Sequence, residues 1–159
     1  MTAPSATVRG TPGGIPLQNG SQTLLTIALD TDISFWEVEL TPPAVDGGEP
    51  IDTTTQHNTL WGTMAPRRIM RLLPYSVQAA YDPDVYDEIA AIINTNTTIT
   101  FTFPDGSTLA HFGFVRSFTP TGGMSDGGFP LADIVIVPSN WDSAGNVEAG
   151  PVMTEVAGT

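Results

Sequence analysis

The sequence contains no cysteine and no lysine, and all five of its basic residues are arginine. The absence of cysteine excludes thiol catalysis, cysteine-type zinc sites and a disulfide framework. Seventeen Asp and Glu residues give a net charge of −12 at pH 7. Because DNA, RNA and anionic membranes are held by Lys and Arg, stable binding to these partners is not expected. The composition fits a surface that nucleic acid passes without being held.

Long apolar runs are also missing from the sequence. No segment approaches the roughly 20 apolar residues of a membrane span, and residues 1–18 lack the apolar core of a secretory signal. We therefore expect a protein without a membrane partner, kept in a cytoplasm-like compartment or carried out inside an assembly. We expect residues 1–20 to form an extended N-terminal arm, residues 21–142 a single domain and residues 143–159 an extended C-terminal tail.

Alternation of apolar and polar residues predicts that most of this domain is β-strand. Strands are expected over residues 22–29, 33–40, 75–81, 97–103, 108–118 and 129–137. Within 108–118 we expect Ala110, Phe112 and Phe114 to face the core. The turn-forming residues of Pro104–Ser107 predict a hairpin between two of these strands.

One helix is expected after the strand at 75–81. Asp82 supplies a side chain able to cap its first turn, and Pro83 suits the first helical position. Apolar residues then recur at helical spacing: Val85, Ile89, Ile92 and Ile93. One face of the helix should therefore pack on a sheet. The predicted fold is mainly β, a β-sandwich or partly open barrel with one flanking α-helix.

Motifs of enzymes and metal proteins have little support. Gly123–Gly127 matches the letters of the G-x-S-x-G nucleophile elbow, with Ser125 as nucleophile. That elbow needs a strand-to-helix turn in a parallel sheet, whereas this match lies between two expected antiparallel strands. His57 and His111 are the only histidines, so a structural role is favoured over a zinc site. We expect no catalytic residue, no metal and no cofactor.

Three carboxylates are candidates for a special surface. Glu37 and Glu39 lie on an expected strand, opposite Trp36 and Val38, and should therefore share a water-facing side. An ordinary solvated face explains them about as well as a special role. Asp133 is a weaker candidate on the last expected strand, because apolar residues flank it on both faces.

The segment from Thr41 to Leu73 contains the candidates for contact with another subunit. Arg67, Arg68 and Arg71 hold most of the positive charge, and we favour their pairing with carboxylates across a subunit boundary over simple solvation. Residues 41–64 are expected to form a long irregular loop, of the kind that is usually functional or ordered by a partner. We expect this loop to dock on a neighbouring subunit, with contacts from Ile51, Asp52, Leu60 and Trp61.

Several stretches follow one another in an informative order: Asp46–Thr55, Asn58–Trp61, Met64–Arg67, Tyr81–Asp87, Phe103–Leu109 and Ile136–Asn140. Together they resemble the major tail tube proteins of long-tailed, non-contractile bacteriophages. The resemblance covers about Phe35 to Asp142, and no single stretch is diagnostic without the others.

The resemblance implies a β-sandwich subunit that assembles into hexameric rings. Such rings stack along a tape measure protein, meet the tail-end proteins and form the tail tube of a virion assembled in the host cytoplasm. The genomic DNA is then ejected through the tube without specific binding. In such a tube the candidate lumen-facing acids are Glu37, Glu39 and Asp133, and the candidate inter-subunit residues are those of the segment from Thr41 to Leu73.

Two other functions stay open from the sequence alone. A carbohydrate-binding β-sandwich would use Trp36, Trp61 or Trp141 as a stacking platform beside an acidic calcium site. An esterase would act through Ser125.

Overall fold

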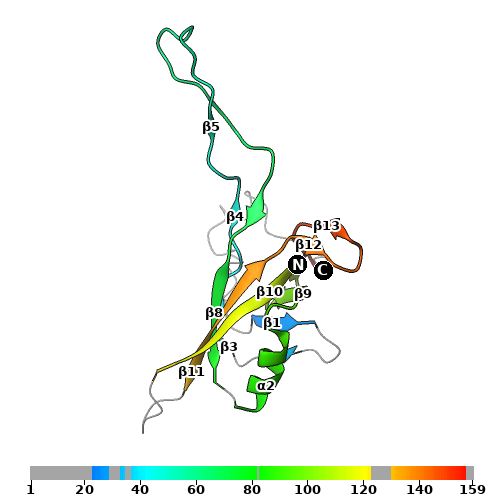
Figure 1. Cartoon of the computed structure of the whole chain (residues 1–159). Coiled ribbons are helices and arrows are strands. Elements are labelled where there is room, and N and C mark those ends of the chain that lie inside the picture. Colours follow the sequence, from blue (N-terminus) through cyan, green and yellow to red (C-terminus); the bar gives the residue numbers. More distant parts are fainter. Residues whose placement is uncertain (1–22, 29–32, 35–36, 82, 123–129, 157–159) are drawn as a thin grey trace, which may run out of the picture.

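The computed structural model describes residues 23–28, 33–34, 37–81, 83–122 and 130–156. Its centre is an antiparallel sheet with the strand order β2-β1-β9-β10-β11-β8-β3, and β14 also pairs with β10 (Figure 1). The strands of this sheet are β1 (Leu24–Ile27), β2 (Ile33–Ser34), β3 (Glu37–Glu39), β8 (Tyr75–Ala80), β9 (Thr97–Thr102), β10 (Thr108–Thr121), β11 (Leu131–Pro138) and β14 (Val152–Thr154).

The two ends of the sheet are formed by consecutive strands. β2 and β3 end the path on opposite sides, although only two residues separate them in the sequence. The sheet must therefore curl back on itself. This arrangement confirms the predicted mainly-β fold, a β-sandwich that is not closed into a barrel.

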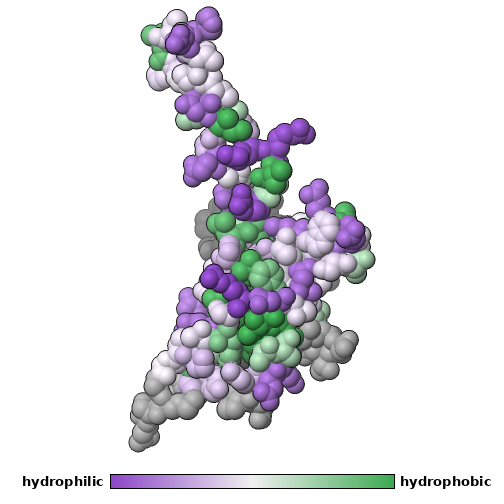
Figure 2. Space-filling view, viewed as in Figure 1, coloured by the Kyte–Doolittle hydropathy of each residue, from purple (hydrophilic) through white to green (hydrophobic). Residues whose placement is uncertain are grey.

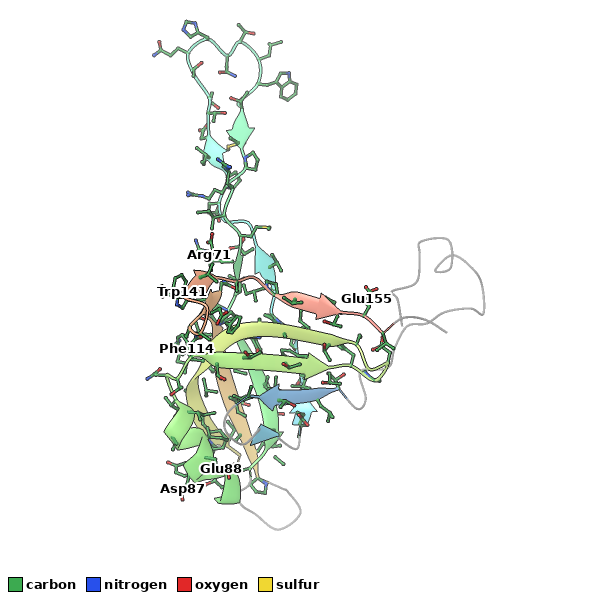
Figure 3. All side chains as sticks on the ribbon, turned by 90° about the vertical axis from the view of Figure 1, so that its right-hand side faces the viewer. Arg71, Asp87, Glu88, Phe114, Trp141 and Glu155 are labelled. Atoms are coloured by element: carbon green, nitrogen blue, oxygen red, sulfur yellow. The ribbon has the colours of Figure 1, made fainter. Side chains whose placement is uncertain are left out.

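Strand β10 belongs to both layers of the sandwich. Its first half, Thr108–Gly113, pairs with β9, and its second half, Gly113–Thr121, pairs with β11. The register shifts between Val115 and Ser117, and such a bulge bends a strand. In Figure 3, β9 and the first half of β10 cross β8 and β11 at a steep angle. The bent strand thus makes the corner between the layers.

The hydrophobic core fills the space between these layers. It consists of buried side chains from β1, β8, β9, β10, β11 and the helix: Leu25, Ile27, Tyr75, Val77, Ala79, Ile92, Ile99, Phe101, Val115, Ile134 and Ile136. The strands expected from alternation at 22–29, 75–81, 97–103, 108–118 and 129–137 are all present, with ends shifted by a few residues.

The single described helix, α2 (Pro83–Ile92), covers one side of this core, as predicted. Ile89 and Ile92 are buried, whereas Asp82 and the side chain of Val85 lie outside the described residues. The chain leaves the helix through Asn94, which has a left-handed backbone (φ 63°) and donates its N–H to the Val115 carbonyl oxygen at 2.9 Å. No helix in the described part of the chain is long and apolar enough to cross a membrane.

The expected inward face of β10 is wrong by one residue. His111, Gly113 and Val115 are buried, whereas Phe112 and Phe114 are half-buried on the opposite face. A side chain at Gly113 would stand 2.9 Å from the Val137 carbonyl oxygen, so the strands approach closely where the core-facing residue has no side chain. The alternation along a strand does not show which of its two sides faces the core. A count of large apolar residues favours the side with Phe112 and Phe114, which is the wrong one.

The segment expected as an irregular loop forms a two-stranded ribbon that projects from the body (Figure 1). Its strands are β4 (Val45–Asp46), β5 (Ile51–Asp52), β6 (Met64–Ala65) and β7 (Arg71–Leu72). The C-terminal region contributes β12 (Trp141–Asp142) and β13 (Val147–Glu148), which pair with each other, before β14 joins the main sheet.

Candidate assembly surfaces

The projecting ribbon, residues 41–74, is called the arm below. Its root is the pairing of β4 with β7, in which Asp46 faces Arg71. Farther out, β5 pairs with β6, and Thr53 donates its N–H to the Thr63 carbonyl oxygen at 2.9 Å. Because both sides are joined by backbone hydrogen bonds at several levels, the arm holds its tip away from the body.

Hydrogen bonds fix the conformation of the arm tip. The Asn58 side-chain oxygen accepts the N–H of Thr55 at 2.8 Å, and its amide nitrogen donates to the Trp61 carbonyl oxygen at 2.9 Å. Thr63 donates its N–H to the Thr54 hydroxyl oxygen at 3.0 Å. These hydrogen bonds satisfy several polar groups of the tip within the tip itself. Leu60 and Trp61, in contrast, are 85% and 82% exposed.

Exposed apolar side chains are concentrated on this arm. Eight large ones lie on it: Val45, Ile51, Leu60, Trp61, Met64, Ile69, Met70 and Leu73. Figure 2 shows apolar patches interspersed with polar residues along the projection. A ribbon only two strands wide has no interior in which to bury them. Eight large exposed apolar side chains gathered on one projecting element favour an interaction site there.

The three arginines expected at a subunit boundary occupy different positions on the arm. Arg67 donates from Nε to the Glu49 carbonyl oxygen at 2.7 Å, across the ribbon. Arg68 and Arg71 line a pocket at the root. Among the described residues, no carboxylate lies within salt-bridge distance of any of the three. Whether they pair with another subunit stays a prediction.

The other arm residues named from the sequence lie farther out. Ile51 and Asp52 form β5, and Leu60 and Trp61 stand at the tip. Hydrogen bonds from the side chain and the N–H of Thr54 lower the pKa of the Asp52 carboxyl group. The structure therefore brings all seven predicted contact residues onto one projecting element, spread from its root to its tip.

A second surface is the face of the sheet opposite the core, called the polar face below after one row of its residues. One row of directly paired residues crosses four strands: Thr119, Asp133, Gln78 and Glu39. Gln78 donates from Nε2 to the Asp133 carboxylate at 3.3 Å. Glu39 and Asp133 share a shallow pocket of about 230 Å³ with Thr41, Ser76 and Gln78. Two of the three predicted lumen acids thus lie together.

Glu37 does not share that face, so the expectation that Glu37 and Glu39 point the same way is wrong. Glu37 pairs with Ala79, a core residue, whereas Glu39 pairs with Gln78. The register shifts between them, and this bulge turns consecutive odd residues to opposite faces. The Glu37 carboxylate accepts the N–H of Leu25 at 2.7 Å, which links β3 at one end of the sheet to β1 near the other end. Strand alternation from the sequence does not foresee a bulge.

The remaining candidate residues do not form a described site. His57 is exposed at the arm tip, and His111 is buried against Tyr75, as expected for a structural histidine. The motif around Ser125, and Trp36, lie outside the described residues. Within the described ranges, no three His, Asp or Glu side chains are grouped so as to hold a metal ion.

Some residues of these surfaces were not foreseen from the sequence. On the arm they are Val45, Met64, Ile69, Met70 and Leu73, and on the polar face Thr41, Ser76, Gln78 and Thr119. The alternation of Tyr75–Ala80 could have identified two of these residues. Its odd-numbered residues face the core, so Ser76 and Gln78 must point away from it. The arm residues carry no such period.

Solved structures with a similar fold are parts of tail-like particles. The chain aligns with a component of the native gene transfer agent virion (TM-score 0.60, 16% identity), over 87% of this chain and 99% of that one. It aligns with a component of the anti-feeding prophage baseplate, solved with sixfold symmetry (TM-score 0.59, 7% identity), over 99% of both chains.

A third structure is the tail of an empty gene transfer agent particle, solved with C6 symmetry. Its TM-score is 0.59 at 13% identity, over 87% of this chain and 99% of that one. The sequence matches no protein-family model and no curated protein. At these identities the likeness shows the fold, which is that of tail components of phage-like particles, in agreement with the resemblance found in the sequence.

Proposed function

We propose that this protein is a structural subunit of a tail tube, without enzymatic activity. Copies form rings, six to a ring, and the rings stack into a tube through which DNA leaves the particle. Its partners are further copies, a tape measure protein and tail-end proteins, and assembly takes place in the host cytoplasm. The fold shared with tail components, two of them in structures solved with sixfold symmetry, supports the proposal.

The observation that carries the proposal is the apolar surface of the arm. Eight large apolar side chains are exposed on a ribbon that projects from the body. Burying such side chains is worth about 25 cal/mol per Å² of apolar surface removed from water. A second copy would bury these side chains, so the free subunit favours self-association.

The polar face suits the wall of a channel for DNA. Its row of Thr119, Asp133, Gln78 and Glu39 carries two carboxylates and no basic residue. Carboxylates repel phosphates, so DNA slides past this face without being held. In a ring, the polar sides of such sheets line one inner surface, while the core and α2 lie on the outer side.

The carbohydrate-binding alternative gains no specific support. Two pockets formed by described residues are lined by Arg, Met, aliphatic and polar side chains, without an aromatic ring on which a sugar would stack. Trp61 stands at the arm tip and Trp141 on β12, on different elements.

Negative-stain electron microscopy of the purified chain tests the proposal. We expect rings or tubes of uniform diameter. The matched control replaces residues 47–70 by Asn-Gly, which fits a two-residue hairpin because Asp46 and Arg71 are direct partners. This variant should fold with similar thermal stability, since none of the buried core residues lies between 47 and 70, but stay monomeric. A wild-type chain that stays monomeric at high concentration contradicts the proposal.

A further inference from the structure

A pocket of about 600 Å³ opens at the root of the arm. Its apolar lining comes from the arm, and its opposite wall from the segment that leads into β14: Val45, Ile69, Met70 and Leu72 on one side, Asn140 and Glu148–Pro151 on the other. The volume falls within the range of about 300–1,000 Å³ typical of pockets that enclose a ligand. Ile69 and Met70 are largely exposed in the isolated subunit.

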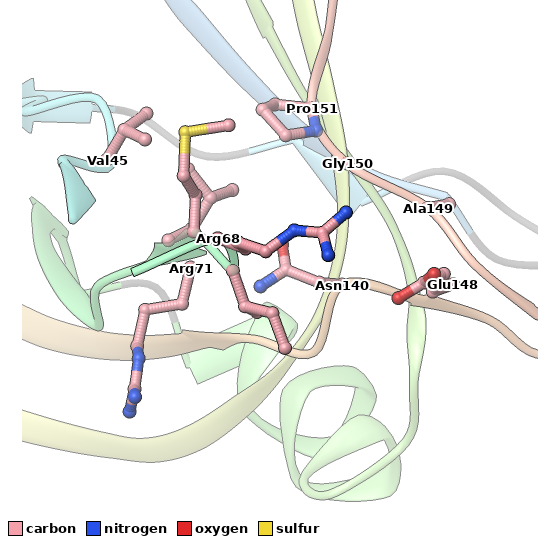
Figure 4. A pocket seen from close by; sticks show the side chains of 11 residues that line it. Val45, Arg68, Arg71, Asn140, Glu148, Ala149, Gly150 and Pro151 are labelled. Atoms are coloured by element: carbon pink, nitrogen blue, oxygen red, sulfur yellow. The ribbon is translucent and has the colours of Figure 1, made fainter. Parts of the chain in front are cut away.

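The pocket also presents the positive charge of Arg68. Figure 4 shows the Arg68 side chain extending toward Asn140 and Glu148, whereas Arg71 points away from them. Among the described residues, no carboxylate is within salt-bridge distance of Arg68. A pocket lined by apolar side chains and a guanidinium group is suited to an aromatic side chain, because the ring face attracts the cation and the ring packs on the apolar groups.

The arm tip presents such a side chain. Leu60 and Trp61 are among the most exposed large apolar residues of the described chain, and the hydrogen bonds of Asn58 hold their backbone in place. Preorganised aromatic anchors carry much of the binding energy at protein interfaces, since little conformational freedom is lost when they dock. Asp52, on the strand leading to the tip, adds a carboxylate complementary to Arg68.

The tip cannot fill the pocket of its own subunit. Val45 at the root and Asn58 at the tip are 13 positions apart in the sequence. At about 3.3 Å per residue, the tip stands up to about 40 Å from the root. The backbone ladders of the arm prevent it from folding back.

We infer that the Leu60–Trp61 tip of one copy inserts into the arm-root pocket of another copy. This inference rests on the proposed self-assembly and names its contact. Donor and acceptor are different surfaces of the same chain, so the contact is heterologous, and each copy that gives its tip still has an empty pocket to offer. A heterologous contact closes into a ring or repeats as an open array, depending on the rotation between copies, and stacking of rings requires the open form. The axial repeat is then at most about 40 Å, the extended reach of the arm.

Thiol cross-linking tests this contact directly, because the chain contains no cysteine of its own. Thr59→Cys places a thiol beside the tip anchors. Gly150→Cys places one at the pocket wall, where an added Cβ has no atom within 4 Å. The two single variants, one of them carrying an affinity tag, are mixed, assembled and treated with a short bismaleimide. We expect a cross-linked dimer that joins residues 59 and 150, identified by mass spectrometry of the linked peptides.

The control pairs Thr59→Cys with Asp87→Cys, an exposed position of α2 at the end of the body far from the arm (Figure 3). This pair should give at least tenfold less cross-linked product. Tubes that form without the 59–150 product overturn the inference and leave the proposed function standing. A chain that forms no tubes and gives no cross-link overturns both. Product in the control pair equal to that in the test pair also overturns the inference.

Discussion

Arg67 and Glu49 are joined across the arm by a hydrogen bond from the guanidinium Nε to the backbone carbonyl oxygen, 2.7 Å long. The Arg67 side chain also covers Gly48, where an added Cβ would lie 3.0 Å from Arg67 Cδ. Gly48 has a left-handed backbone (φ 77°), which suits glycine at this bend. Arg67 therefore has a role inside the arm, besides any contact with another subunit. It links the two sides of the ribbon between its two short ladders.

Replacement of Arg67 should loosen the arm without unfolding the body. In Arg67→Met the Glu49 carbonyl oxygen loses its donor, a local loss of about 1 kcal/mol. We expect faster amide hydrogen exchange in residues 45–72 of the isolated subunit and unchanged exchange in β11. Arg68→Met is the matched control, since Arg68 makes no described hydrogen bond. Equal exchange of the arm in both variants would show that the Arg67 link does not stabilise it.

Trp61 should dominate the energy of association. Trp61→Ala removes an exposed aromatic anchor, and such truncations cost about 2 kcal/mol or more, which is about a thirtyfold weaker affinity. His57→Ala on the same tip is the control and should change assembly little. The critical concentration for tube formation, measured by sedimentation, reports the difference. An equal critical concentration for both variants would remove Trp61 from the interface.

Glu39 and Asp133 should control the passage of DNA. Replacing both by Lys turns a repulsive face into an attractive one, whereas the matched Gln and Asn variants only neutralise it. Tubes of all variants should look alike, but particles with the Lys pair should release DNA more slowly. The effect should be largest at low ionic strength, because screening acts over about 8–10 Å at physiological salt. DNA release by the Lys variant at the wild-type rate at low salt would place this face outside the channel.

His111 should make the fold less stable in mild acid. The ring is buried and its Nε2 lies 2.9 Å from the Tyr75 hydroxyl oxygen, which fits a neutral ring that accepts this proton. Burial lowers the pKa of His111 below its ordinary value of 6.5, partly offset by the Phe112 carbonyl oxygen. Below pH 6.5 the unfolded chain binds a proton at this residue that the folded chain does not bind. The contribution of the neutral His111 to stability is therefore fully present above pH 6.5. It is lost as the pH falls toward the folded-state pKa.

Urea unfolding of the subunit at pH 7.5 and 5.5 measures this effect. The wild type should lose stability over this interval, and His111→Gln, although less stable at pH 7.5, should lose distinctly less. The stability of Tyr75→Phe should still depend on pH, because the buried histidine is still present. An equal loss in the wild type and in His111→Gln would assign the pH dependence to other groups.

Local sequence signals predicted the parts of the fold whose residues interact with near neighbours in the chain. The helix was foreseen from its proline and its isoleucine spacing, and the hairpin at Pro104–Ser107 from its turn residues. Strand alternation located β8, β9 and β11, because one side of each strand faces the core. For the candidate surfaces, the sequence identified the arm segment and its arginines from length and charge.

Only the tertiary structure decided which side of a strand faces which surface. Which side of β10 faces the core depends on the close approach of Gly113 to β11. The opposite directions of Glu37 and Glu39 depend on a bulge in the pairing of β3 with β8. Both are set by a partner strand far away in the sequence, so no local pattern contains them. The arm likewise becomes a ribbon through pairing of Asp46 with Arg71, residues whose contact the chain order does not reveal. The sequence thus determined the elements, their composition and the charge of the protein, and the long-range pairing of strands determined which residues its surfaces present.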